Sequence, residues 1–367
     1  MPRAVTSLRQ SLPSALPGPV RSVFKALKKW LNARVADHFY FPVWLMFQCL
    51  RHRQRAVILF RIGALGDVIC TLPMCAEIRK RHPGRLLIYA VMNDYRKMVL
   101  LSPAVDRVYG ARSWKFIPYL FPGLVEKIYA PQTTDELSPD VGPTNHLIDD
   151  LAQSCGLSPA DRQPRLNPSP EFINTVKSAY GLAAAPGAKR HWLIGINGGH
   201  TWPVKEWDVA KWQQLVNLIH AEYEATILQF GLRRPVGEAD EFDQLTGINS
   251  LVSRVPADQL VALVAGCDLI ISVDSGPVHI AGAVGTPVVG LFGANDPQYR
   301  LPPATPGIGL TSQVPCLFCH HRTPRGHWQK GCPHDICCMK ELDAPIVFAA
   351  VKSMLKKASD ASCVKNT

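Results

Sequence analysis

The chain has 367 residues, of which 47% are hydrophobic and 19% are charged, and its formal net charge is +11. These totals exclude a disordered protein and leave room for two ordinary domains. The positive charge is concentrated at the amino end, where residues 1–55 contain ten Lys or Arg and a single Asp. A basic segment of this kind favours phosphate groups, on anionic lipid or on nucleic acid.

We assign residues 1–54 to an N-terminal arm that lacks the apolar core and cleavage site of a secretory signal. In "RSVFKALKKWLNARV" the apolar side chains recur at helical spacing, at Phe24, Leu27, Leu31 and Val35. This pattern predicts a basic amphipathic helix that suits an anionic membrane surface, and the alternative is a surface helix packed on the body. The next run, "FYFPVWLMFQCL", is too short to span a bilayer and suits an interfacial or buried helix.

From residue 55 the chain alternates between strand and helix signals. The apolar run "AVILF" predicts a buried strand, "GALGD" begins a helix that continues to about Arg81, and "RLLIYAV" predicts the next strand. "SPAVDRVYG" adds a turn and a further strand, and this βαβαβ order predicts a parallel sheet. Residues 111–145 are rich in Pro, Thr and Asp and predict loops with short helical turns. Two helices follow, in "HLIDDLAQSCGL" and "EFINTVKSAYGL".

The alternation starts again after "AAAPGAKR", a plausible domain boundary. "HWLIGINGG", "ATILQFG", "DLIISVDSG" and "TPVVGLFG" predict strands, and helical segments separate them. We therefore expect an α/β protein with two doubly wound units, at residues 55–185 and 186–345, followed by a C-terminal helix and tail at 346–367. Two such units facing each other form a cleft at the carboxyl ends of their strands, where ligands bind by default.

The first candidate site is "GALGD". It has no Gly-Lys-Ser/Thr and is therefore not a Walker A loop, but Gly63 and Gly66 permit a tight strand-to-helix turn. Asp67 follows at the start of the helix. Two interpretations of Asp67 are open. Its side chain caps the helix, or its carboxylate acts as a general base at the cleft.

The second candidate site is "DSGPVH", which directly follows a buried strand. Pro277 suits the first turn of a helix, so the amides of Ser275 and Gly276 would face outward at the positive helix end. Together with Asp274 and His279 they predict a pyrophosphate site. The alternative is a capped helix with a satisfied histidine.

Five cysteines crowd into residues 316–338, in "CLFCHHRTPRGHWQKGCPHDICCM". Cys316 and Cys319 are separated by two residues, and more cysteines follow after a loop. This spacing is typical of a structural tetrahedral thiolate site for a metal. Reduced thiols or a disulfide are the alternatives.

Together, "RIGALGDVICTLP" and "DSGPVHIAGAVGTPVVGLFGANDP" resemble glycosyltransferase family nine, the ADP-heptose:lipopolysaccharide heptosyltransferases, over roughly residues 55–345. The resemblance implies the GT-B fold, with two Rossmann-like domains facing across a cleft, the acceptor domain first and the donor-nucleotide domain second. It also implies inversion at the sugar carbon, with no cofactor or divalent metal needed for transfer. The family's acceptor-side pattern "D-x-x-x-D-x-Q-G" is absent, so the resemblance supports the donor chemistry better than the acceptor identity.

The resemblance also implies roles for individual residues. Asp67 would be the general base, and Lys205 of "WPVKEW" would contact the donor phosphates, unless it is a solvated surface lysine. Glu238, or Glu241 beside it, would bind the ribose. The full donor set is Gly63, Gly66, Lys205, Glu238, Asp274, Ser275, Gly276 and His279. Some relatives hold iron on a cysteine knuckle, and a Cys-Met pair near the end favours Cys338 over Cys337, so the implied iron or zinc ligands are Cys316, Cys319, Cys332 and Cys338.

We therefore expect an inverting glycosyltransferase that moves heptose from ADP-heptose to lipopolysaccharide or another surface-glycan acceptor. It would lie on the cytoplasmic face of the bacterial inner membrane, held by the basic arm. One alternative is an enzyme of the same fold that uses another nucleotide sugar, and another is a catalytically silent glycan-binding protein. Nucleic-acid binding is disfavoured because the chain has no recognised DNA or RNA motif.

Overall fold

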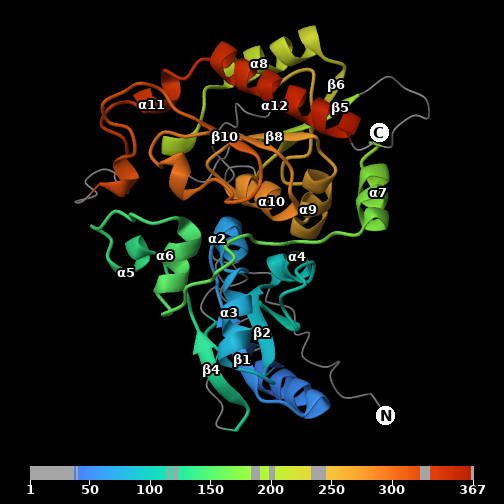
Figure 1. The fold of residues 1–367 in the computed structure, drawn as a ribbon, viewed down its shortest axis with the longest axis vertical. Coiled ribbons are helices and arrows are strands. Elements are labelled where there is room, and N and C mark those ends of the chain that lie inside the picture. The colour runs from blue at the N-terminus through green and yellow to red at the C-terminus, as the bar shows by residue number, and fades with distance from the viewer. Residues whose placement is uncertain are drawn as a thin grey trace, which may run out of the picture.

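The computed structural model describes residues 37–38, 40–113, 116–118, 123–182, 191–197, 203–232, 245–322 and 331–364. Two parallel sheets flanked by helices make up these residues, one in each half of the chain (Figure 1). The predicted α/β class is therefore confirmed. Most of the basic arm, with Glu238 and Glu241, lies outside the described residues.

The first sheet has four strands in the order β3-β2-β1-β4, and every pairing is parallel. Its strands are β1 (Ala56–Phe60), β2 (Leu86–Met92), β3 (Arg107–Ala111) and β4 (Val125–Tyr129). β4 lies in the segment for which the sequence predicted only loops. It is an edge strand whose central side chains, Glu126 and Lys127, are not buried, so it lacks the continuous apolar run of a central strand.

The helices of the first half are short. A helix over residues 40–52 precedes β1, and the others are α2 (Leu65–Cys70), α3 (Met74–Arg81), the 3₁₀ turn η1 (Asn93–Tyr95), α4 (Arg96–Val99), α5 (Thr134–Leu137) and α6 (Leu147–Gln153). The single helix predicted up to Arg81 is in fact two, α2 and α3. The break falls at Thr71, Leu72 and Pro73, because a proline has no N–H to continue the hydrogen-bond ladder.

The second sheet has six parallel strands in the order β10-β9-β8-β5-β6-β7. They are β5 (Trp192–Asn197), β6 (Ala225–Phe230), β7 (Asn249–Ser250), β8 (Leu269–Val273), β9 (Val288–Leu291) and β10 (Gly307–Leu310). The helices are α7 (Pro170–Ala179), α8 (Val209–Glu222), α9 (Ala257–Ala265), α10 (Gly276–Val284), α11 (Cys337–Lys340) and α12 (Ala344–Val364), with 3₁₀ turns η2 (Pro203–Lys205), η4 (Pro297–Tyr299) and η5 (Cys319–His321). The four predicted strands of this half are all present.

The two halves pack directly on each other. α2 of the first half contacts α10 of the second, and α4 contacts α9 (Figure 1). Two glycines permit the first contact: a Cβ on Gly66 would lie 2.6 Å from Cδ2 of His279, and one on Gly276 would lie 2.8 Å from Cδ2 of Leu65. The carboxyl ends of β1 and β8 therefore lead into two helices that touch near their amino termini.

The domain limits stay a prediction, and α7 bears on them. The predicted limits assign this helix to the first unit, yet it packs against α9 of the second half. The chain crosses between the halves before α7, where the amide of Leu166 donates to the carbonyl of Ala283 and the amide of Asn167 donates to the carbonyl of Leu101.

Candidate active site

Asp67 lies in the first turn of α2, but it does not cap the helix. The N-cap position is Ala64, whose side chain cannot accept a hydrogen bond. The carboxylate of Asp67 is 21% exposed and is bound through one oxygen: Nη2 of Arg61 donates to Oδ2 over 2.7 Å. The interpretation of Asp67 as a helix cap is therefore wrong, although a negative charge in the first turn still favours the helix.

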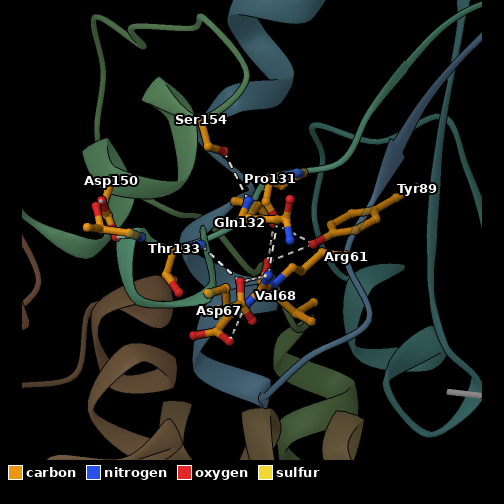
Figure 2. A network of polar contacts seen from close by, with 12 residues as sticks. Arg61, Asp67, Val68, Tyr89, Pro131, Gln132, Thr133, Asp150 and Ser154 are labelled. Atoms are coloured by element: carbon orange, nitrogen blue, oxygen red, sulfur yellow. Dashed lines mark hydrogen bonds and ion pairs between the residues drawn. The ribbon is translucent and has the colours of Figure 1, made fainter. Parts of the chain in front are cut away.

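Arg61 holds two carboxylates at once (Figure 2). Its guanidinium binds both oxygens of Glu136, with Nη1–Oε2 at 2.6 Å and Nη2–Oε1 at 3.0 Å, and Nη1 also donates to the carbonyl of Pro131. The Arg61 side chain is only 5% exposed. Burial opposes its charge, but the two carboxylates outweigh that effect and raise its pKa above the ordinary value. Neither Arg61 nor Glu136 was among the predicted site residues.

A capping box sets the position of Glu136. The residue lies in the first turn of α5, where its Oε2 accepts a hydrogen bond from the amide of Thr133, the N-cap residue. The next residue, Thr134, donates its amide to Asp150 of α6 over 2.9 Å. The signal for this arrangement was present in the sequence as Thr-x-x-Glu at positions 133–136, but nothing local connects it with Arg61.

The second half brings a buried ion pair to the carboxyl end of β8. Nζ of Lys205 lies 2.8 Å from Oδ2 of Asp274, and Nδ2 of Asn295 donates to the same oxygen. Burial alone would raise the pKa of Asp274, but Lys205 and then Arg300 reverse this and hold it well below its usual range. Lys205 is thus not a solvated surface lysine, and Asp274 fixes its ammonium group in place.

His279 links the two halves. It is buried in the first turn of α10, and its Nδ1 lies 3.4 Å from the thiol of Cys70 at the end of α2. Burial lowers the pKa of His279 to about 4, so the ring is neutral near pH 7. Burial also raises the pKa of Cys70, with a smaller effect from the charge of Asp67. The helix that carries the predicted base therefore contacts the predicted donor histidine through the thiol of Cys70.

Ser275 is the N-cap residue of α10, but its hydroxyl makes no capping hydrogen bond. Instead, the amide group of Asn197 on β5 donates to Ser275 Oγ over 2.5 Å. The helix start at Gly276 therefore has no side-chain cap, as expected for an end that is open to an anion. The donor-binding roles of Gly63, Gly66, Ser275 and Gly276 stay predictions.

The cysteines of residues 316–338 lie near one another as free thiols. The closest approach is between Sγ of Cys316 and Sγ of Cys337, at 3.5 Å. Cys338, the predicted fourth ligand, is buried against Gly293. Burial raises its pKa to about 12, and the four neighbouring thiols act in the same direction. Within the part of the chain that the structure describes, no three or more His, Cys, Asp or Glu side chains are arranged to hold a metal ion. The iron or zinc site on these cysteines stays a prediction.

Solved structures with similar architecture define the fold of the protein. Escherichia coli ADP-heptose lipopolysaccharide heptosyltransferase II superposes with a TM-score of 0.59 at 15% identity, over 83% of this chain and 99% of that one. The iron-containing dodecameric glycosyltransferase TibC of enterotoxigenic E. coli gives a TM-score of 0.61 at 15% identity, over 83% of this chain and 76% of that one. A second TibC structure, with a TM-score of 0.60, is a complex with ADP-D-beta-D-heptose. The fold is GT-B.

Sequence comparison gives the family. The model of glycosyltransferase family 9 (heptosyltransferase) matches residues 146–327. Lipopolysaccharide heptosyltransferase 3 of E. coli is 36% identical over 96 residues, which are 25% of this chain and only 28% of that protein. Lipopolysaccharide heptosyltransferase 1 of Pseudomonas aeruginosa is 24% identical over 323 residues, covering 73% of this chain and 86% of that protein. Residues 146–327 therefore form a domain of glycosyltransferase family 9, and the predicted resemblance is confirmed.

The ion pair between Lys205 and Asp274 predicts a change in acid stability. Because the folded-state pKa of Asp274 is lowered, the pair stabilises the folded state above about pH 4, and this contribution is lost as the pH falls through the folded-state pKa. Lys205→Met removes the main cation, so the loss should begin at a higher pH. We expect the acid-unfolding midpoint, followed by circular dichroism, to rise, and the neutral-pH stability to fall by about 3–5 kcal/mol.

Lys211→Met is the matched control, since Lys211 is similarly exposed but pairs with the exposed carboxylate of Asp343. It should leave the acid midpoint nearly unchanged. Adding Asp274→Asn to Lys205→Met should restore much of the lost stability. Equal midpoints for the Lys205 and Lys211 variants would contradict the prediction.

Proposed function

We propose that the chain is an inverting glycosyltransferase that transfers heptose from ADP-heptose to a lipopolysaccharide acceptor. The observation that carries the proposal is the ion pair of Lys205 and Asp274 beside the uncapped amino terminus of α10. A buried carboxylate that fixes a cation next to a positive helix end suits a leaving diphosphate. Asp67, a partly exposed carboxylate, approaches from the other half of the chain.

In the proposed reaction an acceptor hydroxyl attacks the anomeric carbon of the donor sugar. The new bond forms from the acceptor oxygen while the bond to the diphosphate oxygen breaks, and Asp67 takes the hydroxyl proton. Lys205, His279 and the amides at the start of α10 stabilise the negative charge that develops on the diphosphate. His279 is neutral near pH 7, so its contribution is a hydrogen bond rather than a full charge.

The choice of heptose as the sugar rests on relatives. The relatives from E. coli and P. aeruginosa described above are named lipopolysaccharide heptosyltransferases, and TibC has been solved with ADP-D-beta-D-heptose. The main alternative is a different nucleotide sugar on the same fold. A catalytically silent glycan-binding protein fits less well, because it would not need a carboxylate, a fixed lysine and a helix terminus brought together.

The donor class predicts which nucleotide stabilises the protein. A ligand that binds only the folded state adds about 2.7 kcal/mol to its stability when present at a hundred times its dissociation constant. ADP and ADP-heptose should therefore raise the melting temperature in a thermal-shift assay, whereas UDP and GDP sugars should not. A shift with UDP-glucose and none with ADP would replace the proposed donor.

The role of Asp67 predicts a loss of transfer without a loss of donor binding. Asp67→Asn keeps the shape of the side chain but removes the base, so the rate with ADP-heptose and a lipopolysaccharide acceptor should fall about 10²–10⁴-fold. The melting-temperature shift with ADP should persist. Asp94→Asn, at an exposed acid of the same half, should keep its rate. Undiminished transfer by Asp67→Asn would exclude the general-base role.

We also propose that the protein lies on the cytoplasmic face of the inner membrane, through the helix over residues 40–52. One face of this helix, with Phe41 and Leu45, packs on the first sheet. The opposite face exposes five large apolar side chains, each 47% to 67% exposed: Tyr40, Val43, Met46, Phe47 and Leu50. The sequence left two alternatives for this segment, an interfacial helix or a buried helix. In the structure one face of the helix is buried and the opposite face is apolar and exposed.

The charges around this apolar face favour anionic lipid over another protein surface. Arg51, Arg53 and Arg55 are exposed at its carboxyl end, and Arg112 lies over the ring of Tyr40 at 5.1 Å. Residues 38–66 contain no Asp or Glu. An apolar stripe bordered by arginines matches acyl chains beneath anionic headgroups. None of the described helices is both long and apolar enough to cross a bilayer.

The apolar face predicts how the full chain binds vesicles. Each large apolar side chain is worth about 1.5–3 kcal/mol when buried, so Val43→Asp with Phe47→Asp should weaken binding to phosphatidylglycerol vesicles at least tenfold in a sedimentation assay. The controls Leu232→Asp and Ile346→Asp alter exposed apolar residues of the other half and should bind normally. If the double variant binds like the wild type, the face is not the membrane contact.

A further inference from the structure

The guanidinium of Arg61 lies between two carboxylates that come from different elements (Figure 2). Asp67 is on α2, Glu136 is on α5, and Arg61 itself directly follows β1. The loop leaves room for this arrangement, because a Cβ on Gly63 would lie 2.9 Å from Nε of Arg61. Gly63 therefore packs against the arginine, which gives it a role besides the donor contact implied by the family resemblance.

Arg61 occupies only one of the two oxygens of Asp67. The hydrogen bond reaches Oδ2, and none of the described residues donates a hydrogen bond to Oδ1. One oxygen is thus anchored, while the other can accept a proton from a substrate hydroxyl. A carboxylate held in this way keeps its orientation when the substrate binds, which is the geometric requirement for a general base.

A neighbouring arginine, acting alone, makes a carboxylate a weaker base. A cation within hydrogen-bond distance typically lowers the pKa of a carboxyl group by about 1–3 units and so weakens it as a proton acceptor. Here the same guanidinium is also bound by both oxygens of Glu136. The charge of the guanidinium is therefore shared between two carboxylates, and Asp67 does not face an uncompensated cation.

The other ionisable groups near Asp67 are mostly uncharged around pH 7. Burial raises the pKa values of Cys70, Tyr89 and Tyr95, and it lowers that of His279 on α10 to about 4. Asp150 on α6 is bound by Thr134, and the charges of Arg300 and Asp274, in the second half, act on the thiol of Cys70. Among the described residues, the charged group that binds Asp67 is therefore Arg61, and Glu136 is bound to the same guanidinium.

We propose that Arg61 and Glu136 are positioning residues that act as a pair, Arg61 by orienting Asp67 and Glu136 by preserving its basicity. The proposal rests on the proposed role of Asp67 as general base. It gives the acceptor half a function that the missing acceptor pattern did not reveal. Glu136 lies on α5, and α5 is joined to α6 by the hydrogen bond from Thr134 to Asp150. In the proposal, the position of α5 therefore affects the basicity of Asp67 through Glu136 and Arg61.

The test is the pH dependence of kcat/KM for transfer from ADP-heptose, whose acidic limb reports the pKa of the base in the free enzyme. Glu136→Gln leaves the cation of Arg61 unbalanced, so the acidic limb should move to lower pH by about one unit. Arg61→Met removes the cation, so the limb should move to higher pH. The double variant should return the limb toward its wild-type position while its maximal rate stays low, because Asp67 is no longer oriented.

Glu126→Gln is the matched control. Glu126 also binds an arginine, Arg85, but near the amino-terminal end of the same sheet, so its replacement should not move the limb. Because Arg61 is buried, its variant can fail to fold. Glu136 is 41% exposed, and Glu136→Gln then decides alone: an unmoved limb overturns the proposal, and a shift toward lower pH supports it.

The same experiment separates this proposal from the proposed function. If Asp67→Asn transfers sugar at the wild-type rate, Asp67 is not the base and both proposals fail. If Asp67→Asn is inactive but Glu136→Gln and Arg61→Met lower the rate without moving the limb, the function stands. In that case the pair has only a structural role, and the proposal of tuned basicity is overturned.

Discussion

The amino termini of α2 and α10 pack directly against each other, and the contact depends on a glycine in each helix. Gly66 faces the ring of His279, and Gly276 faces Leu65, and a Cβ at either glycine would come within 2.8 Å of its neighbour. This contact fixes the distance between the two halves of the site. It places Cys70, at the end of α2, beside Nδ1 of His279. Any shift of α2 that displaced Asp67 would also disturb His279.

The two site carboxylates differ in what their oxygens are free to do. Oδ2 of Asp274 is bound by Lys205 and by Asn295, and its lowered pKa keeps the group ionised. A carboxylate in that state can hold a cation but is a poor proton acceptor. Asp67 is more exposed and is anchored through one oxygen. The geometry therefore suits the proposed division of work, in which Asp274 organises positive charge for the leaving group and Asp67 acts as the base.

The strands with continuous apolar runs were predictable, because a buried parallel strand needs apolar side chains on both faces. β4, β7 and β10 were not, since they are edge strands that are short or only partly buried, and β4 also pairs with a strand that is distant in the sequence, β1. The site shows the same division. Asp67, Asp274 and His279 lie in local strand-to-helix turns that have recognisable patterns. Glu136 lies 75 residues from Arg61, and only the tertiary fold brings its capping box to the guanidinium.

The glycines of "GALGD" show that a sequence pattern can locate a site without revealing why glycine is needed at each position. A glycine-rich turn before a helix is commonly a phosphate loop, and the pattern by itself favours that interpretation. In the structure each glycine makes room for a particular side chain: Gly63 for Arg61 and Gly66 for His279. One contact supports the orientation of the base, and the other supports the packing of the two halves. The close approach of Arg61 and His279 to the backbone thus explains the two glycines of this loop. This explanation does not require a bound phosphate.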